Sequence, residues 1–302
     1  MTVASIDTYT PDTIASLTAS QIKSLGATGF SSLVASQVAA LSATQLASLT
    51  TAQAAALTID QIVSFSAAQF SALTKTQVAV FSPEEIASLS VSQLAGLSGA
   101  DIAELTTTQV AQLTTTQIAA LSVTQIRSLS STQIHALADT QVAALATTQL
   151  TALSATQLKG MTPTGMAALA TTQVAALTNT QLAALDRTQF AALSATAVSG
   201  LTTTQIANLT EAQIAALNTT QISALTRAQI ASLSDTQVAS LAATQVARLT
   251  TTQLAALTPD AAAGLSETQL GALSLAQMRA LAGASVSRSE ERRVGKECRS
   301  RW

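Results

Sequence analysis

Side chains able to do chemistry are few and scattered in this sequence. His135 is the only histidine, and a catalytic or metal-binding role would need partners that its neighbours in the sequence do not provide. Glu84 and Glu85 form an acidic pair, and Asp101 and Glu104 follow further on, but their place in the repeat described below indicates helix capping or contact with solvent. The sequence has no glycine-rich phosphate loop, ligand cluster or nucleophile–base pair. We therefore expect no catalytic, cofactor-binding or metal-binding residues and no enzyme activity.

The elements that carry these residues are copies of one eight-residue unit. Steps of eight from Leu17 to Leu281 give 34 positions, all of them Leu except Phe65, Phe81 and Met161. A second column of 33 positions holds Gln at 27 of them, and its exceptions are Gly29, Glu85, Asp101, Gly165, Ala197 and Ala261. The consensus is (Ser/Thr)-x-x-Gln-(Ile/Val/Leu)-Ala-x-Leu. Because no insertion shifts the frame, the pattern is a tandem repeat.

The period of eight excludes one long helix and one flat strand. At about 100° per residue, the apolar pair would turn by roughly 80° from repeat to repeat on a continuous helix. On a strand, the alternating spacings of three and five would put the two apolar residues on opposite faces. A short helix that restarts in every repeat fits, because Ser or Thr followed three residues later by Gln is a capping box. The Leu before the cap and the Ile after the Gln then form a hydrophobic staple.

Prolines and glycines test this interpretation independently. The four prolines all follow the cap position directly, at the first helical residue, where a missing N–H costs nothing; they are Pro11, Pro83, Pro163 and Pro259. Glycine recurs just before the Leu, where each helix would end, at Gly96, Gly160, Gly200 and Gly264. The small residue after the Ile, usually Ala, would let successive helices approach closely. Both patterns predict one short helix in each repeat.

A helix this short is unstable alone in water. Its Ile and Leu bury too little apolar surface to offset the loss of chain entropy, so neighbouring repeats must stack and share a core, as in other solenoids. We predict an all-α solenoid over residues 9–282, wound into a superhelix with one very short helix per repeat. A β-solenoid is the alternative. Residues 1–8 would form an N-terminal stub and residues 283–302 a tail outside the repeat.

The composition changes abruptly at Arg288. Residues 288–302 resemble the conceptual translation of a common short-read sequencing adapter, which implies that this stretch, with Cys298 and Trp302, is an artefact and that the gene is truncated. The tail holds six Lys or Arg and three Asp or Glu, so residues 1–287 alone carry a net charge of −5. That negative charge argues against a groove that follows nucleic-acid phosphates.

Two shorter sequence features suggest other classes of ligand, namely DNA and ice or sugars. Leu-Thr-Pro-Asp at 257–260 and Phe-Ser-Pro-Glu at 81–84 are similar to the opening of repeats in TAL effectors, a resemblance that would imply DNA binding by an α-solenoid. The period of eight is shorter than theirs and no variable base-reading pair follows, so we expect no nucleic-acid partner. Thr pairs such as Thr203-Thr204 would suit an ordered array that binds ice or sugars, but we favour a solvated polar face.

The repeat as a whole is similar to low-complexity arrays in very large bacterial surface and secreted proteins of adhesin type. The resemblance covers nearly the whole chain on the consensus quoted above. It implies a non-enzymatic spacer or adhesive scaffold, a fragment of a larger extracellular or cell-surface protein, with a protein or glycan ligand that the sequence does not identify. An intracellular α-solenoid that binds proteins is the alternative.

Two features of the sequence bear on location. Apolar runs such as residues 38–41 are far shorter than the about 20 residues that a membrane span requires, so we expect no membrane insertion. Residues 1–11 lack the basic and apolar regions of a secretory signal peptide, which leaves export through a C-terminal signal open. Cys298 is the only cysteine and excludes internal disulfides.

Overall fold

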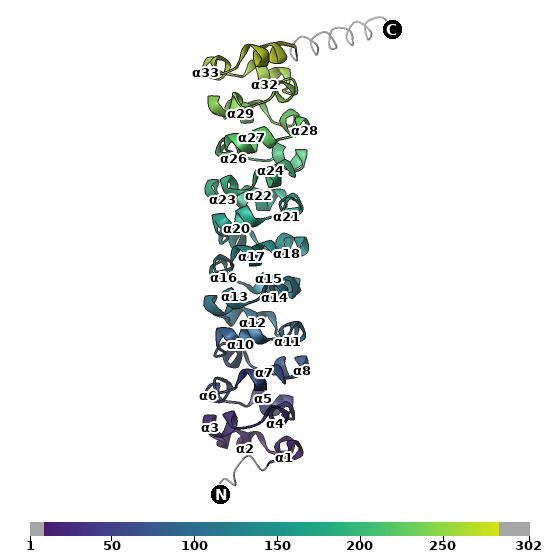
Figure 1. The fold of residues 1–302 in the computed structure, drawn as a ribbon, viewed down its shortest axis with the longest axis vertical. Coiled ribbons are helices and arrows are strands. Elements are labelled where there is room, and N and C mark those ends of the chain that lie inside the picture. The colour runs from purple at the N-terminus through teal and green to yellow at the C-terminus, as the bar shows by residue number, and fades with distance from the viewer. Residues whose placement is uncertain (1–8, 284–302) are drawn as a thin grey trace, which may run out of the picture. The chain divides into compact units, whose positions relative to one another are not determined.

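The computed structural model describes residues 9–283, and every regular element among them is a helix. The described residues divide into two compact units, unit 1 up to Gly160 and unit 2 from Met161 onward. Figure 1 shows the short helices of each unit stacked in successive layers. The predicted all-α solenoid is confirmed, and the β-solenoid alternative is wrong for the residues described. The predicted stub at 1–8 and the adapter-like stretch at 288–302 lie outside them.

Each helix is four to six residues long and occupies one repeat, and no repeat between the first helix and the last is skipped. The helices of unit 1 are α1 (Pro11–Ser16), α2 (Ala19–Ser24), α3 (Gly26–Ser31), α4 (Ala35–Ala39), α5 (Ala43–Ala47), α6 (Thr51–Ala54), α7 (Ile59–Val63), α8 (Ala67–Phe70), α9 (Lys75–Val78), α10 (Pro83–Ser88), α11 (Val91–Gly96), α12 (Gly99–Glu104), α13 (Thr107–Gln112), α14 (Thr115–Ala120), α15 (Val123–Ser128), α16 (Ser131–His135), α17 (Asp139–Ala143), α18 (Thr147–Ala152) and α19 (Ala155–Lys159).

Unit 2 repeats the same arrangement. Its helices are α20 (Pro163–Ala168), α21 (Thr171–Ala176), α22 (Asn179–Ala184), α23 (Arg187–Ala192), α24 (Ala195–Ser199), α25 (Thr203–Ala207), α26 (Glu211–Ala216), α27 (Thr219–Ala224), α28 (Arg227–Ala231), α29 (Asp235–Ala239), α30 (Ala243–Val246), α31 (Thr251–Leu254), α32 (Pro259–Ala263) and α33 (Glu267–Gly271). Residues 275–283 are helical as well.

The helices begin as the consensus predicts. Before α14, the Thr114 hydroxyl accepts a hydrogen bond from the Gln117 N–H at 3.1 Å, and Gln117 Oε1 accepts one from the Thr114 N–H at 2.7 Å. All four prolines occupy the first or second helical position. Where the cap is alanine, as at Ala138 and Ala146, only the bond to the Gln side chain is made. These bonds supply partners for backbone groups that a short helix leaves unpaired at its start.

The apolar columns of the repeat form the core of each unit. In unit 1, Ile118 and Ile126 are fully buried, and Leu121 and Leu129 are almost fully buried. The Leu column and the Ile column therefore both point inward, although they are separated by the turn between helices. This burial is the tertiary contribution that stabilises helices too short to persist alone.

Close packing joins helices three apart in the chain. In unit 1, α8 packs on α11 and α16 on α19, and unit 2 pairs α21 with α24 in the same way. The expectation that small residues bring successive helices together is therefore wrong, because the helices that pack closely are three places apart along the chain. Among the described residues, only α2 and α3 are successive helices that pack closely. Gly96 marks one such contact: a Cβ there would collide with the main-chain oxygen of Ala67.

One repeat departs from the pattern at its start. Gly26 stands in the cap position with a φ of 65°, the only positive φ among residues 9–283. Gly29 stands in the Gln position, so α3 begins directly after Leu25 without a side-chain cap. The left-handed backbone at Gly26, which a glycine adopts without strain, lets α3 follow α2 almost without a break.

Candidate functional site

One Gln side chain bonds two repeats at once. Gln117 Oε1 accepts the Thr114 N–H, and Gln117 Nε2 donates to the main-chain oxygens of Ile86 at 3.0 Å and Leu89 at 2.8 Å. Both oxygens lie at the C-terminal end of α10, four repeats earlier. The same bonds recur in unit 2, for example from Gln237. We refer to this series of Nε2 bonds as the glutamine ladder.

The glutamine ladder supplies hydrogen-bond donors to carbonyl groups at the ends of these very short helices. The last carbonyl groups of a helix have no partner within it, and burying them unpaired is unfavourable. The Gln side chains carry their amide N–H groups into the buried layer: Gln117 is 2% exposed and Gln237 is 3% exposed. Among residues 9–283, no buried side-chain nitrogen or oxygen lacks a hydrogen-bond partner. A Gln side chain thus donates hydrogen bonds to the carbonyl groups at the C-terminal end of the helix four repeats earlier, which lies in the preceding turn of the superhelix.

The two sets of contacts define the winding of each unit. Helices pack on the helix three repeats away, whereas the ladder reaches the helix four repeats back. One turn of the superhelix therefore holds between three and four repeats.

Two acidic residues occupy ladder positions in unit 1. Glu85 Oε2 accepts the Ser82 N–H at 2.7 Å, and Asp101 Oδ2 accepts the Ser98 N–H at 2.7 Å. Both complete capping boxes, as predicted, but an ionised carboxylate has no N–H to donate to an earlier repeat. Burial raises the pKa of Glu85, and the charge of Glu84 acts in the same direction, whereas hydrogen bonds from Ser82 oppose the shift.

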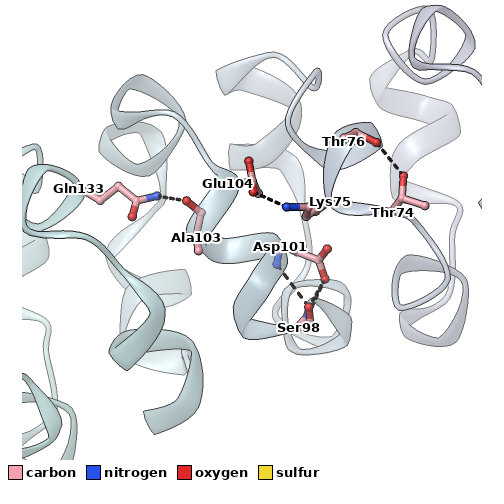
Figure 2. A network of polar contacts seen from close by, with 8 residues as sticks. All are labelled: Thr74, Lys75, Thr76, Ser98, Asp101, Ala103, Glu104 and Gln133. Atoms are coloured by element: carbon pink, nitrogen blue, oxygen red, sulfur yellow. Dashed lines mark hydrogen bonds and ion pairs between the residues drawn. The ribbon is translucent and has the colours of Figure 1, made fainter.

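Figure 2 shows the surroundings of Asp101. Gln133 Nε2 lies 3.4 Å from the main-chain oxygen of Ala103 in α12, a bond of the glutamine ladder. At the outer side of the same helix, Glu104 pairs with Lys75 of α9, with 2.7 Å between Oε1 and Nζ. This is the only ion pair within residues 9–283. The acidic residues of this region therefore serve capping and surface pairing.

His135 borders a cleft that a lysine side chain also lines. The cleft, of about 590 Å³ and open to solvent, is bordered by His135 of α16 and by Lys159 and Gly160 at the end of α19. His135 Nδ1 lies 3.1 Å from the main-chain oxygen of Gly160. Because a carbonyl oxygen only accepts, Nδ1 carries the proton in this contact and Nε2 of the neutral ring is an acceptor. The other lining residues are small or bear hydroxyls: Thr107, Ser131, Thr132, Ala136 and Thr156.

A neighbouring cleft of about 630 Å³ shares Ser131 and Thr156 with the first. Arg127 lines it and donates from Nε to the main-chain oxygen of Ala152 at 3.3 Å. The step from Arg127 to Ala152 spans 25 residues, the same as the step from His135 to Gly160. A long side chain directly after the Ile therefore reaches the end of the helix three repeats onward.

The pairing of His135 with Lys159 in this cleft corresponds to a regular spacing in the sequence, although neither residue belongs to a recognised motif. His135 and Lys159 occupy the same repeat position, 24 residues or three repeats apart. The three-repeat spacing between packed helices makes such residues neighbours, but the number of repeats per turn is not evident from the period of eight. His135 therefore stands alone along the sequence, whereas in space it has a basic neighbour.

The described part of the chain lacks two further features. Within residues 9–283, no three His, Cys, Asp or Glu side chains are grouped so that they could hold a metal ion. None of the helices in this range is long and apolar enough to cross a bilayer.

The comparisons with known proteins agree with the repeat. A family model described as the ALTTAQ repeat matches residues 115–147 in unit 1 and residues 198–227 in unit 2. The second match includes Gly-Leu-Thr-Thr-Thr-Gln at residues 200–205, which runs from the end of one repeat to the Gln of the next. No curated protein matches the chain. Fold and family match together define a helical tandem-repeat protein that is similar to the ALTTAQ repeats.

Proposed function

We propose that this chain is a non-enzymatic repeat scaffold, acting as a spacer or an adhesive surface. The observation that carries the proposal is the glutamine ladder. Its bonds are the same from repeat to repeat, for example from Gln117 in unit 1 and from Gln237 in unit 2. Because each repeat bonds only to near neighbours, repeats can be added or removed without altering the local structure, which is the property that a spacer needs.

An extracellular or cell-surface location in a larger bacterial protein is part of this proposal. Two observations support it. The chain is poor in charge, at 10%, and the helix starts expose hydroxyl side chains such as Thr115 and Thr116. A neutral hydroxyl surface can remain hydrated without strong electrostatic attraction to other macromolecules. Protease shaving of intact cells tests the location, because only a surface protein is cleaved while the cells remain sealed.

A protein-binding solenoid inside the cell is the second candidate. It is favoured by exposed apolar side chains at the cap position of α4 and on α7, two helices that pack together in unit 1. Val34 is 59% exposed, and Ile59 and Val63 are 44% and 46% exposed. Exposed apolar groups close together are typical of protein interfaces. Loss of a partner after substitution of these residues by Ser, with the fold retained, would favour this candidate.

The spacer function is tested by deletions in unit 2. Removing residues 202–217 excises two whole repeats and joins Leu201 to the cap Asn218. We expect the variant to keep its helical circular dichroism, and X-ray scattering to show a smaller maximum dimension. The matched control removes residues 202–213, which leaves residues 214–217 as a partial repeat without a cap or a Gln and shifts the later repeats out of the frame of eight. Helix content should fall in the control, and surface display or partner binding should survive only in the in-frame variant.

Abolition of all binding by the in-frame deletion, with helix content unchanged, would contradict the scaffold. That result would point to one localised site within residues 202–217. Equal tolerance of both deletions would contradict the underlying structure, since the bonds of the glutamine ladder join residues 28 and 31 apart and so require the frame of eight.

A further inference from the structure

The repeat position directly after the Ile is unusually varied in one part of unit 1. Ala occupies this position in 22 of the 34 repeats. In five successive repeats, however, four other residues appear, and they are Arg127, His135, Thr151 and Lys159. Larger polar side chains are therefore concentrated where the fold itself requires only a small residue.

The superhelix brings two of these residues to one cleft. Helices α16 and α19 pack together, so His135 and Lys159 border the same opening although they are three repeats apart. Gly160 permits the close approach, since a Cβ at this position would collide with the main-chain oxygen of Ser131. Gly160 and Ala136, which have no polar side chain, are among the residues that line the cleft.

The electrostatic surroundings of the cleft are positive. Lys159 is exposed and belongs to no ion pair of residues 9–283. Arg127 lines the adjoining cleft. Between residues 105 and 160 the only carboxylate is Asp139, which lines neither cleft. An anionic ligand would therefore be attracted here, although the chain as a whole is acidic.

We propose that this cleft binds an acidic sugar, a hexuronic acid residue of a glycan. Lys159 would hold the carboxylate, and a sugar hydroxyl would donate to His135 Nε2, which the contact with Gly160 leaves as an acceptor in the neutral ring. The hydroxyls of Ser131, Thr132 and Thr156 would bond the remaining hydroxyls of the ring. An apolar face of the sugar would lie over Ala136.

The geometry favours a uronic acid over a bare anion. The cleft combines a cation with an acceptor, several hydroxyls and a small apolar area, so that phosphate would use only part of it. The inference rests on the proposed scaffold function, for which it names the ligand of an adhesive surface. The two are separable, because a spacer could pass the deletion test in unit 2 without any ligand in unit 1.

The test is a titration of the full chain with trigalacturonic acid, followed by calorimetry. Lys159→Ala and His135→Ala are the informative variants, since both introduce the residue that most repeats carry at this position and so preserve the fold. Lys23→Ala is the matched control: it removes a cation from the same repeat position in α2, away from the cleft. We expect the first two variants to weaken binding by about tenfold each, and the control to leave it unchanged.

Two further titrations complete the test. The neutral trisaccharide trigalactose should bind at least about tenfold more weakly than trigalacturonic acid, and binding of the acid should weaken as salt rises. Inorganic phosphate should not displace the acid at equal concentration. Absence of binding, equal loss in Lys23→Ala, or displacement by phosphate would each overturn the proposal.

Discussion

At the scale of the residue, the glutamine ladder explains why the repeat carries Gln where a capping box would accept Glu as readily. The capping box uses only the side-chain oxygen, which Glu85 and Asp101 also provide. The bond to the earlier repeat uses the Nε2 group, which a carboxylate lacks. Gln is therefore the residue that meets both demands, one within its repeat and one between turns.

Replacing Gln117 by Glu should separate these two demands. The variant keeps the oxygen for the Thr114 N–H but places a carboxylate beside the main-chain oxygens of Ile86 and Leu89. We expect the free energy of unfolding at neutral pH to fall by about 2–4 kcal/mol, measured by urea denaturation. Thr116→Glu, at an exposed neighbouring position, is the control and should change it by less than about 0.5 kcal/mol. Equal effects would mean that the ladder contributes nothing.

Glu85 offers the reverse experiment. By the ladder spacing, Glu85→Gln would place Nε2 against the main-chain oxygens of Ala54 and Leu57, 31 and 28 residues earlier, as Gln77 does with its own earlier repeat. We expect stabilisation at neutral pH of about 1 kcal/mol, the usual net contribution of one hydrogen bond, measured by urea denaturation.

The benefit of Glu85→Gln should depend on pH. Burial raises the pKa of Glu85 in the folded chain, with Glu84 acting in the same direction, so the folded chain holds this proton more tightly than the unfolded chain. The native protein therefore gains stability as pH falls through the folded-state pKa, and this gain is lost again as pH rises through it. The advantage of the variant should shrink toward acid pH. An advantage that grows there would contradict the raised pKa.

At the scale of the element, each helix depends on its cap and on the helix three repeats away. A Ser or Thr cap such as Ser122 completes both bonds of the capping box, whereas Ala146 makes only one, from its N–H to Gln149 Oε1. Contacts between helices in turn depend on small residues at the close approaches, such as Gly96 of α11 beside Ala67 of α8. Each short helix must therefore satisfy both the capping bonds at its start and the close packing on the helix three repeats away.

Ala146→Ser should complete the capping box of α18. The new hydroxyl can accept the Gln149 N–H, as Thr114 accepts that of Gln117 before α14. We expect the free energy of unfolding to rise by about 1 kcal/mol, and Thr114→Ala to lower it by a similar amount. Thr148→Ser, at an exposed position inside α18, is the control. A rise in the control as large as that of Ala146→Ser would show that capping is not the cause.

Gly96→Ala should destabilise unit 1 although alanine is the better helix former. The added methyl group would meet the main-chain oxygen of Ala67, so one of the two helices must shift, at a cost of about 1–3 kcal/mol. Gly271→Ala is the matched control, because no atom lies within 4 Å of the added Cβ. It should be neutral or raise the thermal midpoint. The same loss at both sites would refute the close packing.

At the scale of the whole molecule, stability is a property of successive turns and not of single repeats. A ladder bond needs a repeat and the fourth repeat before it, as between Gln125 and Leu94. Fragments of four repeats or fewer therefore contain no bond of the glutamine ladder, and each repeat added beyond four contributes the ladder bonds of one further Gln. This makes stability depend on repeat number in a stepwise manner.

Two fragments of unit 1 test that dependence. Residues 90–121 hold four repeats and contain no complete ladder bond, whereas residues 90–153 hold eight and contain those of Gln125, Gln133, Gln141 and Gln149. We expect the first to give the circular dichroism of an unfolded chain and the second to be helical with cooperative urea unfolding. A helical four-repeat fragment would show that the ladder is not needed for folding.

The sequence by itself determined where each helix begins, which residues cap it and which residues enter the core, because capping boxes, prolines and apolar columns act within eight residues. It also indicated that the repeats must stack. The tertiary structure alone decided that Gln117 reaches back four repeats, that Gly160 serves close packing with a right-handed backbone, and that His135 and Lys159 share a cleft. These features depend on the number of repeats in one turn of the superhelix. That number is set by packing between turns and cannot be predicted from the sequence of a single repeat.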